Sequence, residues 1–137
     1  MNYIYPAIFT EDTDGILVDF PDLPNCYTDG TTIAEAFENA EDALALALWH
    51  LEEQHAAIPP ASAPAELSVP AGASVALVRA DTLPVRQMNN TRTVRKNVTL
   101  PGWMDTLARE RNINFSKLLQ NAIRKECGIN IKIPIIH

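Results

Sequence analysis

Residues 93–127 read TVRKNVTLPGWMDTLARERNINFSKLLQNAIRKEC, and the spacing of their apolar side chains changes partway along. Val94, Val98 and Leu100 alternate with polar residues, which is the period of an extended strand with two different faces. The Pro-Gly pair at positions 101–102 ends this alternation. The pattern therefore predicts a strand, and its polar face carries Arg95, Asn97 and Thr99.

Helical spacing replaces the alternation after residue 102. The apolar residues between Trp103 and Ala108 recur at intervals of three and four, which predicts a helix that lasts to Asn112. Asn114 is a good N-cap for a second helix, which Gly128 ends. The apolar face of this second helix consists of Leu118, Leu119, Ala122, Ile123 and Cys127.

One strand and two short helices cannot close a core by themselves. A lone strand leaves its N–H and C=O groups unpaired, and about 35 residues is below the size at which a core stabilises itself. A second copy removes both problems, because two strands can pair antiparallel about a twofold axis over four intertwined helices. The sequence therefore predicts an obligate homodimer with a two-stranded ribbon, an element that fits the DNA major groove.

The motif R-x-N-x-T-L-P at residues 95–101, followed by two helices of these lengths, resembles the ribbon-helix-helix family of DNA-binding domains. The resemblance implies that the polar strand triplet reads bases and that the second helix directs its N-terminal N–H groups at a phosphate. Lys96 departs from the pattern, because alternation places it on the inner face. The alternative is an ordinary strand-helix-helix packing unit. The candidate DNA-binding residues are Thr93, Arg95, Asn97, Thr99, Asn114, Phe115, Ser116 and Lys117.

The charge of the chain changes sign along its length. Residues 1–86 hold 14 Asp and Glu against two Arg, a net charge of −12. Residues 87–137 hold nine Lys and Arg against three acids, a net charge of +6. This division predicts two modules with oppositely charged partners, a polyanion for the basic end and a cationic partner for the acidic end.

The two cysteines predict neither a metal site nor a disulfide. Cys26 and Cys127 lie far apart and outside any C-x-x-C spacing, as is typical of a reduced, cytoplasmic protein. The N-terminus has no basic region followed by a long apolar core, and no apolar run approaches the length of about 18 residues that spans a membrane. We therefore expect a cytoplasmic protein without a membrane partner.

The first half of the chain has strand and turn signals around one long helix. A proline at position 6 suggests that the first strand is an edge strand or contains a bulge. Thr32 and Glu35 form a capping box that opens a helix of about six turns. The predicted strands are residues 3–10, 16–20, 27–28 and 75–79, with residues 66–69 as a further candidate.

These elements predict an α+β fold, in which a small antiparallel β-β-β-α-β sheet is covered by one long helix. Residues 83–91 contain a proline and the polar run QMNN, and the charge changes sign there, so they are the best candidate for a linker. The expected organisation is a sheet module at 1–82, a linker at 83–91, the strand-helix-helix module at 92–128 and an isoleucine-rich C-terminal tail at 129–137.

The segment DGILVDFPDLP at residues 14–24, followed by the capped, alanine-rich helix and by IPP at residues 58–60, resembles the HicB antitoxins. The resemblance covers most of the first 80 residues. It implies a partial ribonuclease H-like fold without catalysis that masks a HicA-type toxin, a small basic protein that cleaves messenger RNA. It also implies repression of the antitoxin's own operon through a C-terminal helix-turn-helix or ribbon-helix-helix, and two helices after a strand favour the latter.

Charge also suggests which residues of the first module contact a partner, because an acidic surface associates quickly with a basic protein. A run of charges is, however, more often a solvated face. The candidate partner-binding residues are Asp12, Asp14, Asp19, Asp22, Glu35 and Glu38, followed by Asp42, Glu52 and Glu53. Self-association of the first modules through edge strands would turn the dimer into a tetramer.

Two other functions remain as alternatives. A metal-dependent nuclease needs several carboxylates that converge on ions about 4 Å apart, and the spacing of Asp12, Asp14, Asp19 and Asp22 does not force them together. A ligand-sensing transcriptional regulator needs a pocket, yet no Gly-rich phosphate loop and no clustered polar residues point to one. We therefore expect a protein that is not an enzyme, with no catalytic residues, metal or cofactor.

Overall fold

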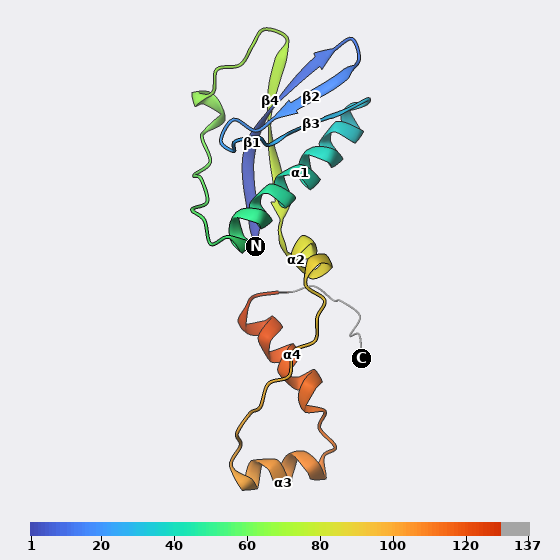
Figure 1. The fold of residues 1–137 in the computed structure, drawn as a ribbon, viewed down its shortest axis with the longest axis vertical. Helices are drawn as coiled ribbons and strands as arrows, with labels where there is room; N and C mark the ends of the chain where they lie inside the picture. The colour runs from blue at the N-terminus through green and yellow to red at the C-terminus, as the bar shows by residue number, and fades with distance from the viewer. Residues whose placement is uncertain (130–137) are drawn as a thin grey trace. The chain divides into compact units, whose positions relative to one another are not determined.

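The computed structural model describes residues 1–129 and divides the chain into two compact units (Figure 1). Unit 1 consists of residues 1–93 and contains every strand of the described chain. Unit 2 begins at Val94 and contains two helices. The α+β class predicted from the sequence is therefore confirmed.

Unit 1 is built on a four-stranded antiparallel sheet with the strand order β3-β2-β1-β4. β1 and β2 form a hairpin, β3 continues the meander, and the fourth strand returns to pair with β1 on its other side. This is the predicted β-β-β-α-β arrangement. The strands are β1 (Asn2–Asp12), β2 (Gly15–Asp19), β3 (Tyr27–Gly30) and β4 (Ala73–Asp81).

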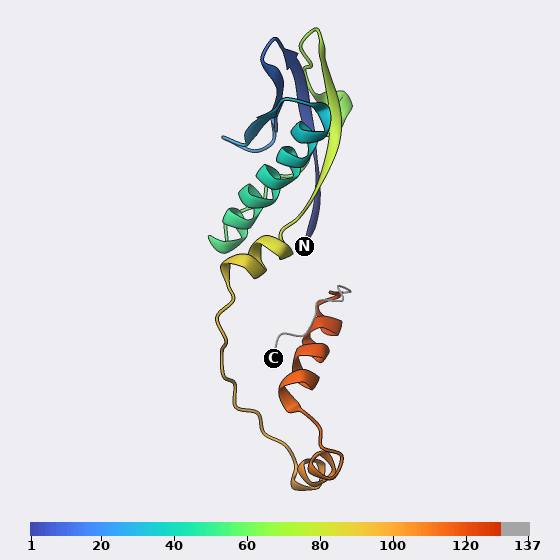
Figure 2. The same ribbon diagram turned by 90° about the vertical axis from the view of Figure 1, so that its right-hand side faces the viewer.

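The long helix α1 (Ile33–Glu53) crosses one face of this sheet (Figure 2). Thr32 caps it as predicted, because its hydroxyl accepts a hydrogen bond of 3.1 Å from the Glu35 N–H. The second bond of the predicted capping box differs, since the Glu35 carboxylate accepts from the Thr31 hydroxyl. Leu44 and Leu48 of α1 pack on inward side chains of the strands, and each fully buried side chain of this kind stabilises the fold by about 1.5–3 kcal/mol. None of the helices among residues 1–129 has the length and apolar character needed to cross a membrane.

Pro6 lies in an interior strand, so the predicted edge position or bulge is only partly right. β4 pairs with β1 along Asn2–Thr10, and Pro6 lies opposite Leu77 in that ladder. The ladder with β2 starts only at Ile8. The first part of β1 therefore has a paired neighbour on one side alone, which is where a residue without an N–H is tolerated.

Two segments differ from the prediction. Residues 66–69 do not form a strand; Glu66 ends a single 3₁₀ turn, η1 (Pro64–Glu66), which contacts β4. Residues 83–91 are not an extended linker, because Leu83–Asn89 form the helix α2, which contacts α1. The proline that suggested a linker stands in the first turn of α2, where its missing N–H costs no hydrogen bond.

Unit 2 contains the two predicted helices, α3 (Gly102–Glu110) and α4 (Phe115–Glu126). Asn112 has a φ of 53°, a left-handed conformation that reverses the chain between them. Asn114 caps α4 as predicted, because its side chain accepts a hydrogen bond of 3.1 Å from the Lys117 N–H. Gly128 follows α4 with a φ of 69°.

The predicted strand before α3 forms no ladder within this single described chain, where residues 90–101 carry no regular structure. A ladder requires a partner strand, and the prediction assigned that role to a second copy. The strand therefore stays a prediction about an assembly of two chains. Of the predicted C-terminal tail, only Ile129 is described, and residues 130–137 lie outside the described part of the chain.

Candidate functional site

Unit 2 presents an apolar groove to solvent. The groove encloses about 570 Å³ between the segment before α3 and the two helices. Its walls are mainly aliphatic and aromatic, and most of these side chains are exposed although they lie at the core positions of their helices. An exposed apolar surface of this kind marks an interaction site. The apolar lining residues are Val98, Leu100, Met104, Leu107, Ala108, Ile113, Phe115, Leu118, Leu119 and Ala122.

The segment before α3 presents two different faces, as the alternation predicted. Lys96 lines the groove together with Val98 and Leu100. Lys96 therefore lies on the groove side, as the alternation placed it. There its aliphatic chain can pack against apolar side chains while its amine stays in water. The predicted base-reading residues Arg95, Asn97 and Thr99 alternate with this set, are exposed and do not line the groove.

The first turn of α4 holds the predicted phosphate site. The Lys117 N–H donates a hydrogen bond to the Asn114 side chain, and the Leu118 N–H donates one to the Asn114 carbonyl. The N–H groups of Phe115 and Ser116 make no hydrogen bond within residues 1–129, as is usual for the first helical turn. Thr93 is exposed at the boundary of the two units.

The acidic residues predicted to bind a partner are only partly brought together. Asp12 and Asp14 of the β1–β2 hairpin lie with Glu35 of α1 around a hollow of about 140 Å³. Asp29 of β3 completes this group, and it was not among the predicted partner-binding residues. Glu38 is exposed on α1, and Asp19 is exposed at the end of β2.

Asp22 has a structural contact instead. Its two carboxylate oxygens accept hydrogen bonds from the Ser62 N–H at 2.8 Å and from the Ser62 hydroxyl at 2.6 Å. These bonds tie the loop after β2 to the irregular segment that leaves α1. Tyr5 secures the same segment, because its hydroxyl donates to the Pro59 carbonyl. Asp22 therefore holds the fold of unit 1, and its predicted contact with a partner stays a prediction.

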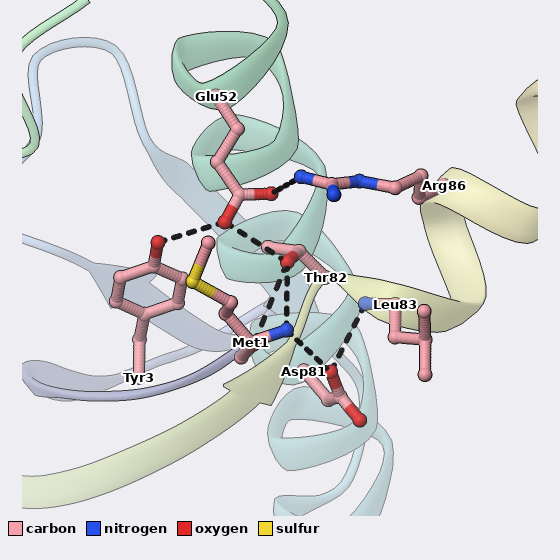
Figure 3. A network of polar contacts seen from close by, with 7 residues as sticks. All are labelled: Met1, Tyr3, Glu52, Asp81, Thr82, Leu83 and Arg86. Atoms are coloured by element: carbon pink, nitrogen blue, oxygen red, sulfur yellow. Dashed lines mark hydrogen bonds and ion pairs between the residues drawn. The ribbon is translucent and has the colours of Figure 1, made fainter. Parts of the chain in front are cut away.

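Glu52 likewise lies in a network of polar contacts and not on the surface (Figure 3). Its side chain is 7% exposed and accepts hydrogen bonds from the Tyr3 hydroxyl at 2.7 Å and from the buried Thr82 hydroxyl at 3.1 Å. Arg86 of α2 forms an ion pair of 2.9 Å with the other carboxylate oxygen. The network joins β1, α1, the end of β4 and α2, so it attaches α2 to unit 1.

These contacts change the pKa values of both acids. Burial, with the hydrogen bond to Glu52 and its negative charge, raises the pKa of Tyr3 to about 12. Burial alone would raise the pKa of Glu52, but the hydrogen bonds from Tyr3 and Thr82 and the Arg86 guanidinium outweigh it and hold that pKa below its usual value. The carboxylate is therefore the form that this network stabilises.

The sequence contained a signal for this network. Arg86 is one of only two Lys or Arg residues among the first 86 residues, so a carboxylate partner within the acidic unit was to be expected. No spacing rule connects it to Glu52, however, because the pair is 34 residues apart.

The carboxylates of the described chain do not form a metal centre. No group of three or more His, Cys, Asp or Glu residues among residues 1–129 has the geometry to hold a metal ion. The hollow at the hairpin is lined by four acids and contains no histidine or cysteine.

Comparison with known proteins gives a consistent result. Residues 5–123 match the profile of the family described as "HicB_like antitoxin of bacterial toxin-antitoxin system". Antitoxin HicB 2 of Photorhabdus laumondii subsp. laumondii is 39% identical over 92 residues, which are 67% of this chain and 64% of that protein. The match thus spans less than two thirds of that relative's length.

Two solved structures resemble the chain along most of its length. A chain described under "Toxin-Antitoxin complex from Streptococcus pneumoniae" is 27% identical with a TM-score of 0.59, over 92% of this chain and 99% of that chain. The Burkholderia pseudomallei antitoxin HicB is also 27% identical, with a TM-score of 0.50, over 90% of this chain and 96% of that chain.

Proposed function

Because this chain belongs to the family of HicB-like antitoxins, we propose that it neutralises a HicA-type toxin through unit 1 and represses its own operon through unit 2. The observation that carries this proposal is the family match over residues 5–123, which extends across both units. Both activities are binding functions and need no catalytic residue. A partial ribonuclease H-like fold for unit 1 stays a prediction from the resemblance.

A toxin partner for unit 1 has two supports. The matched Streptococcus pneumoniae chain comes from a toxin-antitoxin complex. The net charge of −12 in residues 1–86 favours a cationic protein, because complementary charge speeds encounter and disfavours partners of like charge. Among the predicted contact residues, Asp12, Asp14 and Glu35 lie around one hollow, whereas Asp22 is occupied by Ser62.

DNA binding by unit 2 rests on three features of the described chain. The apolar groove fits a second copy, since pairing two segments at residues 93–100 would satisfy their backbone groups while the groove is filled. The polar residues Arg95, Asn97 and Thr99 alternate with the groove side. The first-turn N–H groups of α4 offer an anion site. The resulting homodimer would read the major groove with a ribbon.

Toxin neutralisation is tested by co-production of this chain with a HicA-type toxin. We expect the toxin to stop growth when produced alone and to be harmless with the full chain, and the two proteins to purify as one complex. A complex that dissociates more readily at high salt would agree with an attraction dominated by charge. Growth arrest that persists at an excess of this chain would contradict the proposal.

Operator binding is tested on the DNA upstream of the gene. We expect binding that weakens steeply with salt, and Arg95→Ala and Asn97→Ala should each cost about 1–3 kcal/mol of specific binding. Arg109→Ala is the matched control, because Arg109 is an exposed arginine of α3 that pairs with Asp105 and not with the strand. A footprint that is unchanged in the strand variants, or lost equally in the control, would refute the ribbon assignment.

A further inference from the structure

The two faces of the sheet in unit 1 are covered unequally. Side chains alternate along a strand, so the residues beside those that pack under α1 belong to the opposite face. Tyr5, Phe9 and Val18 are buried on the α1 side. Ile4, Ile8 and Leu17 must therefore lie on the other side, together with Val75 and Leu77 of β4 by the same alternation. We call this second surface the open face.

The strand register makes the open face continuous. Pro6 and Leu77 are direct partners across β1 and β4, as are Ile8 and Val75. Directly paired residues of antiparallel strands have their Cβ atoms about 5 Å apart, so these side chains touch along the sheet. Leu17 extends the same face onto β2 opposite Thr10.

The open face is accessible on both sides of Pro6, whose own side chain is fully buried. With the irregular segment between α1 and β4 in place, Ile4 is 54% exposed, Leu17 is 50% exposed and Leu77 is 55% exposed. Single exposed leucines are common on protein surfaces and need no explanation. Three on adjacent strands of one face, with half-buried Ile8 and Val75 between them, form an apolar surface that a partner can cover.

The charge around the open face indicates which partner covers it. Asp19 lies opposite Ile8 and Asp29 lies opposite Leu17, so both acids stand on the open face at its β3 side. Arg79, opposite Ile4, is the cation of this face among the paired residues. A second copy of unit 1 would bring two surfaces of the same negative charge together, which disfavours that pairing. A cationic protein with an apolar centre fits both the surface and its margin.

We propose that the open face is the surface of unit 1 on which the toxin docks, with its apolar centre on Ile4, Leu17 and Leu77 and its basic residues beside Asp19 and Asp29. This inference rests on the proposed function and adds the location of the binding surface. The location explains why α1 can pack closely against the other face of the sheet without blocking the partner.

The test compares two double variants of the full chain. Leu17→Lys with Leu77→Lys places two cations on the open face, whereas Ile33→Lys with Leu46→Lys makes the same change in charge on α1. The control residues are equally accessible, since Ile33 is 60% exposed and Leu46 is 47% exposed. Binding of each variant to a purified HicA-type toxin is measured by titration, and unfolding of unit 1 is measured alongside.

We expect the open-face variant to bind the toxin at least about 30-fold more weakly and the α1 variant to bind within about threefold of the unmodified chain. Equal binding by both variants, or a loss confined to the α1 variant, would overturn the location. A change in self-association without a change in toxin binding would assign the face to a second copy and overturn it as well. If the unmodified chain does not bind the toxin, the proposed function itself fails.

Folding of the variants is controlled by a milder substitution. If two lysines unfold unit 1, Leu77→Ser and Leu46→Ser give the same comparison without added charge. Leu77→Ser should weaken toxin binding measurably more than Leu46→Ser, and the reverse order would contradict the inference. Asp19→Asn should make toxin binding less sensitive to salt, because it removes a charge from the margin of the surface.

Discussion

At the scale of single residues, the clearest case is Glu52, a carboxylate that looks like part of an acidic surface and belongs to the interior. Three donors converge on it, from β1, from the residue between β4 and α2, and from α2, and only one of them carries a charge. A buried carboxylate with fewer partners would lose more free energy through desolvation than it gains. The position therefore depends on the complete set of donors.

Glu52→Gln should destabilise unit 1 by about 1–3 kcal/mol at neutral pH, because the amide loses the ion pair with Arg86. The pKa of Glu52 is lowered in the folded state, so its contribution is present above the pKa of the unfolded chain and is lost as the pH falls through the folded pKa. Denaturant unfolding from pH 7 to pH 3 measures this. The stabilities of the two proteins should converge in acid.

Glu53→Gln is the matched control for this experiment. Glu53 is the next residue of α1 and is exposed, so its substitution should leave the free energy of unfolding at neutral pH unchanged. The free energies of unfolding of Glu52→Gln and of the unmodified chain could instead differ by the same amount at every pH. That result would show that the charge of the carboxylate has no role.

The thiol of Cys26 should be almost unreactive in the folded chain. It is buried in the core of unit 1, and burial, followed by the negative charge of Asp19, raises its pKa to about 11. At pH 8 the thiolate is then about a hundred times scarcer than for an ordinary cysteine. In a Cys127→Ser variant, reaction with a thiol reagent should be at least that much slower than in denaturant. Equal rates in both states would contradict the buried position.

At the scale of elements, the closest approach in unit 1 is between the end of β3 and the first turns of α1. A Cβ atom built on Gly30 would lie 2.4 Å from the Ala36 N and 2.6 Å from its Cα. These are backbone atoms of a helix and cannot move away alone. Glycine at position 30 therefore sets how near α1 can lie to the sheet.

Gly30→Ala should accordingly destabilise unit 1 by about 1–3 kcal/mol or more, as forced overpacking does. Gly102→Ala is the control, because its Cβ meets no atom within 4 Å and it should be tolerated. Thermal unfolding followed by circular dichroism measures both. If Gly30→Ala melted at the same temperature as the unmodified chain, β3 and α1 would have to lie farther apart than the distances at Gly30 indicate.

The success of the sequence predictions also varied by element. The caps at Thr32 and Asn114 were predicted, because a cap depends on residues three positions apart. The short turn at residues 13–14 indicated that β1 and β2 are neighbours, whereas the pairing of β4 with β1 was not predicted. α2 was missed, since its seven residues have weak helical periodicity and are held by Arg86, whose partner lies on another element. Local patterns cannot report contacts of that kind.

At the scale of the whole molecule, the division of charge predicted two units, and the chain divides after Thr93, close to the predicted linker at residues 83–91. The sites were less predictable. The alternation at residues 94–100 gave the correct groove side, because period two is a property of the backbone. The acids of unit 1 could not be sorted, since contacts such as Asp22 with Ser62 join residues 40 positions apart. The open face could not be predicted either, because it depends on the pairing of β1 with β4, two strands that are distant in the chain.

The two units should unfold separately, and only unit 2 should depend on protein concentration. Its helices leave their apolar groove exposed, so they gain most of their stability from a partner copy and follow mass action. Unit 1 closes its own core around α1 and needs no partner. Each unit contains one tryptophan, Trp49 in unit 1 and Trp103 in unit 2. Trp49→Phe therefore reports unit 2 by fluorescence, and Trp103→Phe reports unit 1.

We expect a tenfold dilution to lower the unfolding midpoint of the Trp49→Phe protein and to leave that of the Trp103→Phe protein in place. Leu118→Glu, in the groove of unit 2, should abolish the concentration-dependent transition, whereas Leu46→Glu on α1 should not. A single transition seen by both tryptophans and insensitive to dilution would mean that the chain folds as one body. The groove would then be covered by the chain itself, and the dimeric ribbon on which operator binding depends would have no basis.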